Sequence, residues 1–400
     1  MSLNTKLDFE ARKNKRKKQI IPQITMKTYD TIIIGAGIAG LSCAYHLQKQ
    51  GIDFLLISKD IGGRIRTSAD GAANYGAFFV CSDYDNVLPF ITLKKRIRLS
   101  DFCFHDDDTT YTFYEPQLLP YLHQLLKTKL LLYRFRKHLR NLRKTTETIS
   151  QKNALEADSF LHSLYLKNAT DFIKEQNLTK GTDKYLSKAL YSTTFSTVDE
   201  MNAFSFLHYL LPLITPIFTF TFEKNTITSS FQEKIQIDSV NSIHSTADQH
   251  KIKTIKETFI AKNLMLATEL SWSSRFLGIT EMNTAVSTHM MHIRGTPKIE
   301  TAQKNYHLFS PLSTTQAIAD LQDGTFLFYY KDRQPALNTY FHSPQVIDSH
   351  FWDPAGRING HILIESKRAN NLYLIGDYNI VGLEETFITG KYAAYQLSIS

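Results

Sequence analysis

The chain has 400 residues, of which 42% are hydrophobic and 21% are charged, with a formal net charge of +8. This length allows two domains with buried cores, and the composition is typical of a globular protein. Much of the excess charge lies in residues 1–26, a basic arm that we expect to be disordered and that lacks the apolar segment of a signal peptide. The rest is nearly neutral, so we expect no nucleic-acid partner, although contact of the arm with acidic lipid or nucleic acid is an alternative. The 3 cysteines are too few and too scattered for a disulfide framework or a metal site, and they favour a reducing, cytoplasmic setting.

A strand, a glycine turn and a helix are predicted near the start of the chain. Tyr29–Ile34 is rich in β-branched residues and predicts a buried strand, and apolar residues recur at helical spacing after the turn. The turn is Gly35-Ala36-Gly37-Ile38-Ala39-Gly40, a G-x-G-x-x-G in the context of a dinucleotide site. Gly35 permits the tight turn, Gly37 lets backbone approach a pyrophosphate, and Gly40 lets the helix pack on the strand.

A second glycine pair follows the next predicted strand. Residues 51–58 predict a turn and a parallel strand, and Gly62-Gly63-Arg64 comes shortly afterwards. This combination resembles the flavin-containing amine oxidase superfamily, which includes protoporphyrinogen oxidases and phytoene desaturases. The resemblance implies non-covalently bound FAD, with Gly62 and Gly63 beside it and Arg64 near its diphosphate. That family ends the second strand with an acidic residue that binds ribose, whereas this chain has Ser58, whose neutral hydroxyl forms a weaker hydrogen bond, and Asp60 is the alternative for this contact.

The resemblance implies further FAD contacts along the chain. Gly76 and Ala77 match the point at which family members run their backbone past the flavin ring, and Val240 matches a residue whose backbone meets the adenine. Gly376 and Asp377 end a predicted strand and match residues near the ribityl chain or the phosphates. Thr386 lies at the start of the last helix, whose positive end is expected to face the flavin.

The catalytic residues of the family are matched only in part. Many amine oxidases hold a water at flavin N5 with a lysine, but the corresponding stretch here has none, and His289 is the candidate polar group, with a structural histidine as the alternative. The family often frames its substrate with two aromatic residues. One of these positions is Gly382 here, and Trp352 or Phe351 is the candidate for the other. These departures favour larger carbon skeletons over a small amine.

The order of elements predicts an α/β fold, in which an α+β substrate domain is inserted into a Rossmann-like FAD-binding domain. We expect the FAD-binding domain to comprise residues 27–98, 227–275 and 346–400, and the substrate domain residues 99–226 and 276–345. Residues 121–144 predict a basic amphipathic helix, which allows peripheral contact with a membrane, although a core-facing helix is the simpler alternative. The longest apolar stretch, residues 207–222, contains two prolines and is not expected to span a bilayer.

These expectations together predict an FAD-dependent oxidoreductase. It would remove a hydride from a C–N or C–C bond of an apolar or amine-bearing organic substrate onto flavin N5, and oxygen or another acceptor would reoxidise the flavin. The alternatives are a redox-neutral FAD enzyme, such as an isomerase or mutase, and a non-catalytic relative that binds a partner. The sequence suggests no serine–histidine–acid set, metal-ligand cluster or P-loop, which disfavours a hydrolase or a kinase.

Overall fold

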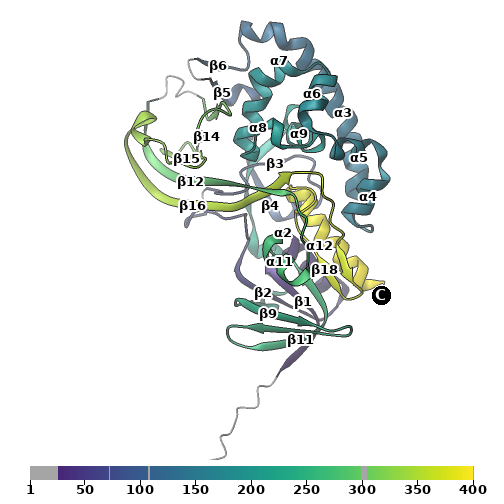
Figure 1. Cartoon of the computed structure of the whole chain (residues 1–400). Coiled ribbons are helices and arrows are strands. Elements are labelled where there is room, and N and C mark those ends of the chain that lie inside the picture. The colour runs from purple at the N-terminus through teal and green to yellow at the C-terminus, as the bar shows by residue number, and fades with distance from the viewer. Residues whose placement is uncertain (1–25, 72, 107–108, 299–303, 400) are drawn as a thin grey trace, which may run out of the picture.

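The computed structural model describes residues 26–71, 73–106, 109–298 and 304–399. The predicted basic arm lies outside these residues except for Met26. The described chain contains sheets of eight, seven and three strands, together with a group of helices (Figure 1). The predicted mixed α/β fold is confirmed.

The eight-stranded sheet is built around a run of parallel strands in the order β18-β11-β1-β2-β8. Strand β17 is antiparallel at one edge, and strands β9 and β10 form an antiparallel pair beside β11. The strands of this sheet are β1 (Lys27–Ala36), β2 (Phe54–Ile61), β8 (Ile235–Ile237), β9 (Val240–Ser245), β10 (His250–Thr254), β11 (Thr258–Leu266), β17 (Lys367–Ala369) and β18 (Leu372–Leu374).

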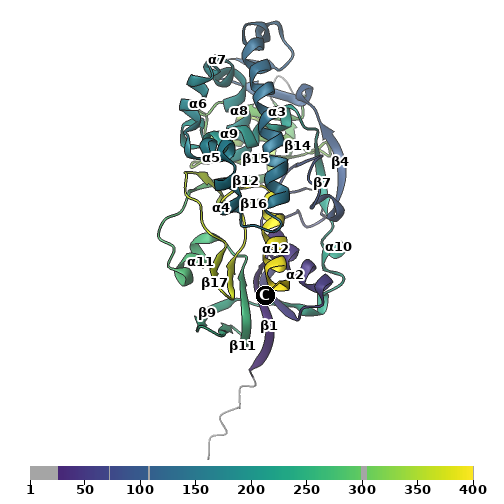
Figure 2. The ribbon, with the colours of Figure 1, turned by 90° about the vertical axis from the view of Figure 1, so that its right-hand side faces the viewer.

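Alternating side chains bury both faces of this sheet, as is usual for parallel strands. Ile33 and Leu56 pack in one core with helices α2 (Ile38–Gln50) and α12 (Leu383–Ser398). Their neighbours Ile32 and Leu55 pack in another core with strand β10 and helix α11 (Leu270–Leu277). Helices α2 and α12 therefore cover the same face of the sheet, and they lie side by side (Figures 1 and 2).

The seven-stranded sheet has the order β16-β12-β15-β14-β13-β5-β6. Its long strands β12 and β16 curve away from the eight-stranded sheet (Figure 1). The strands are β5 (Phe102–His105), β6 (Thr110–Thr112), β12 (Thr284–Pro297), β13 (Tyr306–Phe309), β14 (Thr315–Asp320), β15 (Thr325–Tyr330) and β16 (Phe341–Asn359). The three-stranded sheet pairs β3 (Val80–Cys81) and β4 (Ile91–Ile97) with β7 (Ile217–Phe222).

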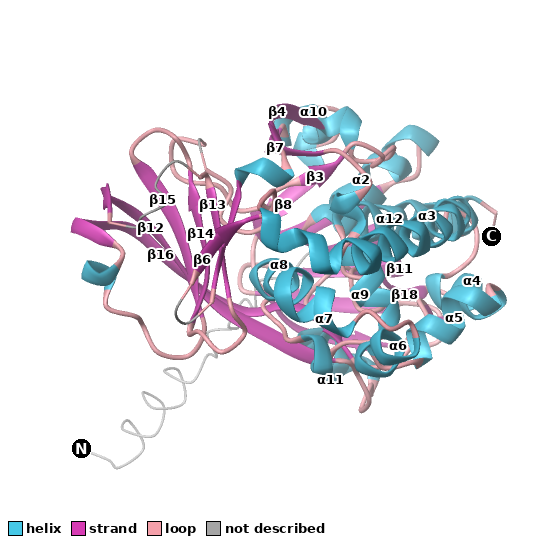
Figure 3. Cartoon of the chain, turned by 90° about the horizontal axis from the view of Figure 1, so that it is seen from above, coloured by secondary structure: helices cyan, strands magenta, loops and turns pink. Residues whose placement is uncertain are grey.

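Most of the remaining helices form one group with its own core beside the seven-stranded sheet (Figure 3). They are α3 (Leu122–Thr145), α4 (Gln151–Ala157), α5 (Ser159–Leu166), α6 (Ala169–Glu175), α7 (Thr179–Gly181), α8 (Ser187–Thr194) and α9 (Ala203–Tyr209), with α10 (Lys224–Thr228) packed near α2. In the described part of the chain, no helix is both long enough and apolar enough to cross a bilayer. The proposed division into two domains stays a prediction, and strand β16 crosses its boundary at residue 346.

Candidate cofactor site

The parallel strands of the eight-stranded sheet end at one edge, where open α/β sheets bind their ligands. Strand β1 ends there with Gly35 and Ala36 and leads into Gly37, and strand β2 leads into Gly62 and Gly63. Strand β11 is followed by Thr268 and strand β18 by Gly376. The glycine residues predicted from widely separated parts of the sequence are therefore brought to the same edge.

Helix α2 begins at this edge with an open N-terminus. Its N-cap is Gly37, no side chain among the described residues caps it, and its first turn holds no acidic residue. A Cβ atom at Gly37 would meet nothing within 4 Å. The backbone amides of the first turn lack helical partners, and together with the helix dipole they favour an anion. The space and the donors thus fit the diphosphate of a dinucleotide.

The second glycine pair lies directly against this helix end. Gly63 has a φ of +57°, and a Cβ atom there would lie 3.1 Å from the Cα atom of Gly37. Gly35 has a φ of +105°, and its Cβ atom would lie 2.5 Å from the carbonyl oxygen of Ala267. A Cβ atom at Gly40 would overlap the carbonyl oxygen of Gly35. The close approach of turn, helix and glycine pair therefore requires residues without side chains.

Ser58 lies beside the expected adenosine end of this edge. Its hydroxyl accepts a hydrogen bond from the backbone N–H of Ala36 at 3.0 Å. Its carbonyl oxygen accepts from the backbone N–H of Asp238 at 2.9 Å, two residues before Val240. Ser58 and Val240 are thus in neighbouring parts of the structure, and the serine also helps to hold the first glycine turn.

Arg64 and Asp377 form an ion pair across the edge. The guanidinium of Arg64 donates to a carboxylate oxygen of Asp377 at 2.5 Å and to the carbonyl oxygen of Ala355 at 3.0 Å. A second pair, Arg357 and Glu269, lies with them around a narrow cavity, and its two hydrogen bonds are 2.9 and 3.0 Å long. This second pair was not predicted from the sequence, in which its partners are 88 residues apart.

The backbone at Gly76 packs tightly between Arg64 and Trp352. A Cβ atom at Gly76 would overlap the carbonyl oxygen of Arg64 and would lie 3.4 Å from the Trp352 ring. The N–H of Ala77 donates to that same carbonyl oxygen at 3.3 Å. Trp352 is buried, and its indole nitrogen has no hydrogen-bond partner among the described residues.

His289 and Trp352, the two predicted catalytic residues, do not lie on the same side of the seven-stranded sheet. Trp352 pairs with Thr288 across strands β16 and β12, whereas His289 pairs with Phe351. The His289 ring stacks between Phe351 and Tyr330, with centroids 4.4 and 4.9 Å away. Because successive residues of a strand point to opposite faces, His289 lies on the face of Phe351 and not on that of Trp352, and the catalytic roles of these residues stay predictions.

His292, which the sequence analysis did not consider, shares the face of Trp352. It pairs with Asp348 across the strands and binds the hydroxyl of Tyr75 through Nδ1 at 3.1 Å. Its Nε2 has no hydrogen-bond partner among the described residues, and burial lowers the pKa of the ring. Two buried nitrogens, those of His292 and Trp352, thus lack partners on the face that packs around Tyr75.

The N-terminus of helix α12 carries buried carboxylates. Glu384 accepts three hydrogen bonds of 2.8 to 3.1 Å from Asn86 and from the backbone of Val87, and burial raises its pKa to about 7. Glu385 forms an ion pair with Arg143 at 2.7 Å, and His208 lies 3.5 Å away. Burial favours a raised pKa for Glu385, but the charges of Arg143 and His208 hold it well below its usual value.

Thr386 in the first turn of α12 and Gly382, the N-cap of this helix, bear on the predicted flavin contact. The backbone N–H of Thr386 donates to the carbonyl oxygen of Gly382 at 3.0 Å, so this amide is already paired. A Cβ atom at Gly382 would overlap the carboxylate of Glu385 and lie 3.2 Å from the ring of His208. The close packing of these side chains excludes an aromatic residue at this position.

Comparisons with known proteins agree with this architecture. The family described as NAD(P)-binding Rossmann-like domain matches residues 33–92. A Drosophila melanogaster protein, "Possible lysine-specific histone demethylase 1", is 38% identical over 84 residues, which are 20% of this chain and 9% of that protein. The structure of a putrescine oxidase with bound putrescine is similar, with a TM-score of 0.66 and 12% identity. The alignment covers 94% of this chain and 100% of the putrescine oxidase chain.

Cyclohexylamine oxidase from Brevibacterium oxydans is also similar in structure, with a TM-score of 0.60 and 13% identity. The alignment covers 93% of this chain and 98% of the oxidase chain. The chain has the fold of these two amine oxidases. The structure of a CLA-producing fatty acid isomerase from P. acnes is about equally similar, with a TM-score of 0.65 and 13% identity. The alignment covers 91% of this chain and 97% of the isomerase. The resemblance stated from the sequence is thus confirmed at the level of the fold, which is shared by proteins of different activity.

Proposed function

We propose that the protein is an FAD-dependent oxidoreductase that removes a hydride from a C–N or C–C bond of an organic substrate. The observation that carries this proposal is the open N-terminus of α2, with Gly37 facing empty space and Gly63 packed beside it. An uncapped helix end at the carboxyl edge of a parallel sheet suits a dinucleotide diphosphate. The similar folds of putrescine oxidase and cyclohexylamine oxidase support a flavin rather than another dinucleotide.

The residues around this edge divide into three groups according to their place along the proposed cofactor. Gly37, Gly63 and Arg64 would hold the diphosphate, and Ser58 and Val240 would meet the adenosine. Gly62, Gly76, Ala77, Gly376, Asp377 and the first turn of α12 around Thr386 would lie along the ribityl chain and the flavin. FAD would supply the hydride acceptor, while the protein orients the substrate and excludes water. All three cysteines are buried and none follows residue 103, which supports non-covalent binding.

The substrate is proposed to lie against the face of β12 and β16 that carries Trp352 and His292. Trp352 supplies an apolar wall beside Gly76, and the unpartnered nitrogens of Trp352 and His292 could bind a polar group of the substrate. His292 replaces His289 as the candidate polar residue because it shares this face. An apolar or amine-bearing molecule fits such a surface better than a highly charged one.

The first test is the visible absorption spectrum of the purified protein before and after incubation with FAD and desalting. We expect flavin bands in the wild type. Gly37→Val should weaken FAD binding more than about 100-fold, because its side chain fills the space for the diphosphate, while the backbone conformation of Gly37 (φ −72°) accepts valine. The circular dichroism spectrum and the Tm of the FAD-free proteins should therefore be the same, whereas FAD should raise the Tm of the wild type alone.

The matched control is Gly51→Ala at the other end of α2. Gly51 has a φ of +70° and open space around it, so alanine there costs about 1–2 kcal/mol of stability without reaching the cofactor. FAD binding in this variant should equal that of the wild type. A wild-type protein that stays colourless with FAD, or a Gly37→Val variant that binds FAD normally, would contradict the proposal.

Anaerobic bleaching of the bound flavin then separates substrate classes. Amines and larger apolar carbon skeletons are added in turn, and reduction of the flavin identifies the class that is oxidised. Product formed in excess over the bound flavin, without an added electron acceptor and without bleaching, would instead identify the redox-neutral alternative.

We further propose that the protein contacts membranes through one side of α3. Four exposed apolar side chains follow each other at helical spacing on this side, and Leu119 extends them on the turn before the helix. Their exposed fractions range from 41% at Leu122 to 70% at Leu130, and the four residues on α3 are Leu122, Leu126, Leu130 and Tyr133. Exposed cations, among them Lys129 and Lys137, flank this stripe. An apolar stripe bordered by cations suits the surface of an anionic bilayer.

Sedimentation with phosphatidylcholine vesicles, with and without phosphatidylglycerol, tests this contact. We expect binding to the anionic vesicles and a loss of about tenfold or more when Leu126 and Leu130 are both changed to serine. Leu312→Ser is the control, because Leu312 is 83% exposed and belongs to the turn between β13 and β14, not to α3. Equal losses in both variants, or no binding by the wild type, would refute the contact.

A further inference from the structure

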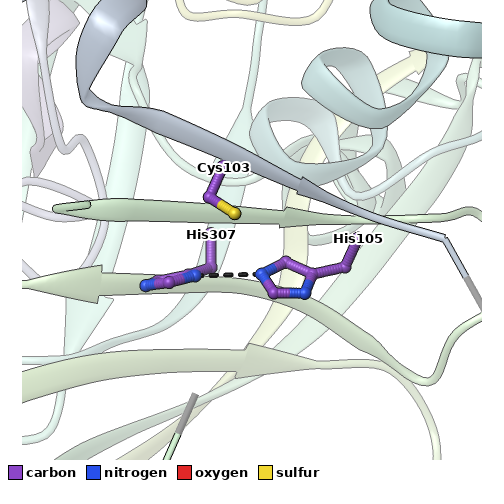
Figure 4. Close-up of side chains that lie close together, drawn as sticks. All are labelled: Cys103, His105 and His307. Carbon is purple, nitrogen blue, oxygen red and sulfur yellow. Dashed lines mark hydrogen bonds between the residues drawn. The ribbon is translucent and has the colours of Figure 1, made fainter. Parts of the chain in front are cut away.

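Three potential metal ligands meet on one face of the seven-stranded sheet. Cys103 and His105 are two residues apart on β5, so their side chains point to the same face. His307 lies on the neighbouring parallel strand β13, directly opposite Cys103. Figure 4 shows the sulfur atom and the two imidazole rings close together.

The ligand atoms of these residues all lie within 4.8 Å of one another. Nε2 of His105 and Nδ1 of His307 are 2.9 Å apart and share a hydrogen bond. Cys103 and His307 are buried, whereas His105 is partly exposed. The cluster is therefore shielded on the strand side and open to solvent past one imidazole.

His105 is held with Nε2 toward the cluster. Its other nitrogen, Nδ1, lies 3.2 Å from the hydroxyl of Thr110, and its ring stacks on Phe309 with centroids 4.5 Å apart. When Nδ1–H donates to Thr110, Nε2 carries a lone pair that faces Nδ1 of His307. Metal-binding histidines are commonly oriented by such a second hydrogen bond.

We infer that Cys103, His105 and His307 bind one thiophilic transition-metal ion of the Zn²⁺ type. One thiolate and two neutral imidazoles match the ligands that Zn²⁺ takes, whereas Mg²⁺ and Ca²⁺ require oxygen ligands. Binding releases the thiol proton of Cys103 to solvent, and the proton that Nδ1 of His307 shares with His105 moves to Nε2 of His307, so that both imidazoles stay neutral and each offers a lone pair to the ion. The fourth position belongs to water, because the adjacent carboxylate of Asp106 is paired with Lys184 and Lys188 at 3.0 and 2.7 Å.

Only small side-chain movements are needed to form this site. With Zn–N distances of about 2.0–2.1 Å and tetrahedral angles, the two nitrogens would separate from 2.9 Å to about 3.3 Å. The sulfur would come to about 3.5 Å from each nitrogen. Since all ligand atoms lie within 4.8 Å of one another, no pair of them has to approach by more than about 1.3 Å.

The site is distinct from the proposed cofactor edge and does not depend on it. Cys103, His105 and His307 belong to β5 and β13, whereas the cofactor edge is formed by the ends of the eight-stranded sheet. A bound ion would tie together two strands that are about 200 residues apart in the sequence, so it is expected to raise the Tm.

Titration of the tag-free protein with Co²⁺, which reports on Zn²⁺ sites by its absorption spectrum, tests the inference. We expect one Co²⁺ to bind per chain and to give a thiolate-to-metal charge-transfer band in the near ultraviolet. One equivalent of Zn²⁺ should displace the Co²⁺ and remove this band. Cys103→Ser should abolish the charge-transfer band and weaken binding more than about 100-fold. Thr110→Val, which removes only the outer hydrogen bond to His105, should weaken binding about 10–100-fold.

Cys81→Ser is the matched control, because Cys81 is also buried but lies on β3, away from the histidines. Its spectrum and affinity should match those of the wild type. If Cys103→Ser does not fold, His105→Gln at the partly exposed position takes its place and should weaken binding to the same extent. No binding by the wild type, or a charge-transfer band that persists in Cys103→Ser or is lost in Cys81→Ser, would overturn the inference.

Discussion

Helices α2 and α12 pack against each other and begin at the same edge of the eight-stranded sheet, but their N-terminal ends differ. Helix α2 begins at Gly37 with open space and without acidic residues in its first turn. Helix α12 begins with Glu384 and Glu385, both almost fully buried and both bound by other side chains or backbone amides. The positive end of α12 is thus met by carboxylates of the chain itself, whereas that of α2 is left for an anion from outside.

This difference suggests separate roles for the two helix ends, with the α2 end suited to binding the cofactor and the α12 end to stabilising the fold around it. The α2 end has the amides and the space that a diphosphate needs, and its sequence is mostly glycine and alanine. The α12 end is fixed to the helical group through Arg143 on α3 and His208 on α9. Substitutions at the N-terminus of α12 should therefore mainly lower folding stability, and substitutions at the N-terminus of α2 should mainly weaken cofactor binding.

The largest effect is expected from Arg143→Met, which leaves Glu385 without its main partner. Both side chains are less than 10% exposed, and removing one member of a buried ion pair typically costs about 3–5 kcal/mol. Urea unfolding measures this loss. Lys167→Met is the control, because Lys167 and Glu175 form an exposed pair whose loss should cost less than about 1 kcal/mol. Equal losses in the two variants would show that Glu385 is supported without Arg143.

The next effect concerns pH and Glu384. Burial raises its pKa from 4.5 to about 7, so between these values the unfolded chain releases the proton while the folded protein keeps it. Folding stability should then fall as pH rises through this window, by at most roughly 3 kcal/mol, and become constant above it. Unfolding by urea at several pH values measures the slope, which Glu384→Gln should flatten. A slope that is the same in both proteins would mean that hydrogen bonds from Asn86 and Val87 keep Glu384 ionised.

The sequence predicted the parts of the site that depend on local structure. The glycine turn at residues 35–40 lies between a strand and a helix. The tight turn and the close backbone approach there require glycine, so these positions can be recognised from the residue type itself. Gly63 and Gly376 likewise follow predicted strands, so their arrival at the carboxyl edge follows from the parallel sheet. These positions could be identified without knowing which distant segments meet.

The interactions that were missed all depend on pairing between distant segments. Arg143 and Glu385 are 242 residues apart, and neither position has a local signal for an ion pair. Cys103 and His307 become neighbours only through the register of β5 and β13. For His289 and His292, alternation along β12 predicts opposite faces, but only the packing of β12 against Tyr75 shows which face is turned inward.

A smaller effect is expected from Gly390→Ala, which tests how the two helices are held together. A Cβ atom at Gly390 would overlap the carbonyl oxygen of Ala39 and lie 2.7 Å from the backbone nitrogen of Cys43. Since these are backbone atoms of α2, the helices must separate, at a cost of about 1–3 kcal/mol. Thermal unfolding measures the loss, with Lys391→Ala as a neighbouring control that should cost no more than about 1 kcal/mol. A stable Gly390→Ala variant would mean that α12 can shift along α2 freely.

The smallest effect is expected at the adenosine end of the proposed FAD site, where Ser58→Glu introduces an acidic residue. A charged acceptor binds a ribose hydroxyl more strongly than a neutral one by about 1 kcal/mol, so FAD affinity should rise about fivefold. Equilibrium dialysis with FAD measures this change. Asp60→Asn is the control, because Asp60 is exposed and should alter affinity less than about twofold. If Asp60→Asn lowers affinity and Ser58→Glu does not raise it, Asp60 already contacts the ribose, and Ser58 serves chiefly to hold the backbone of Ala36.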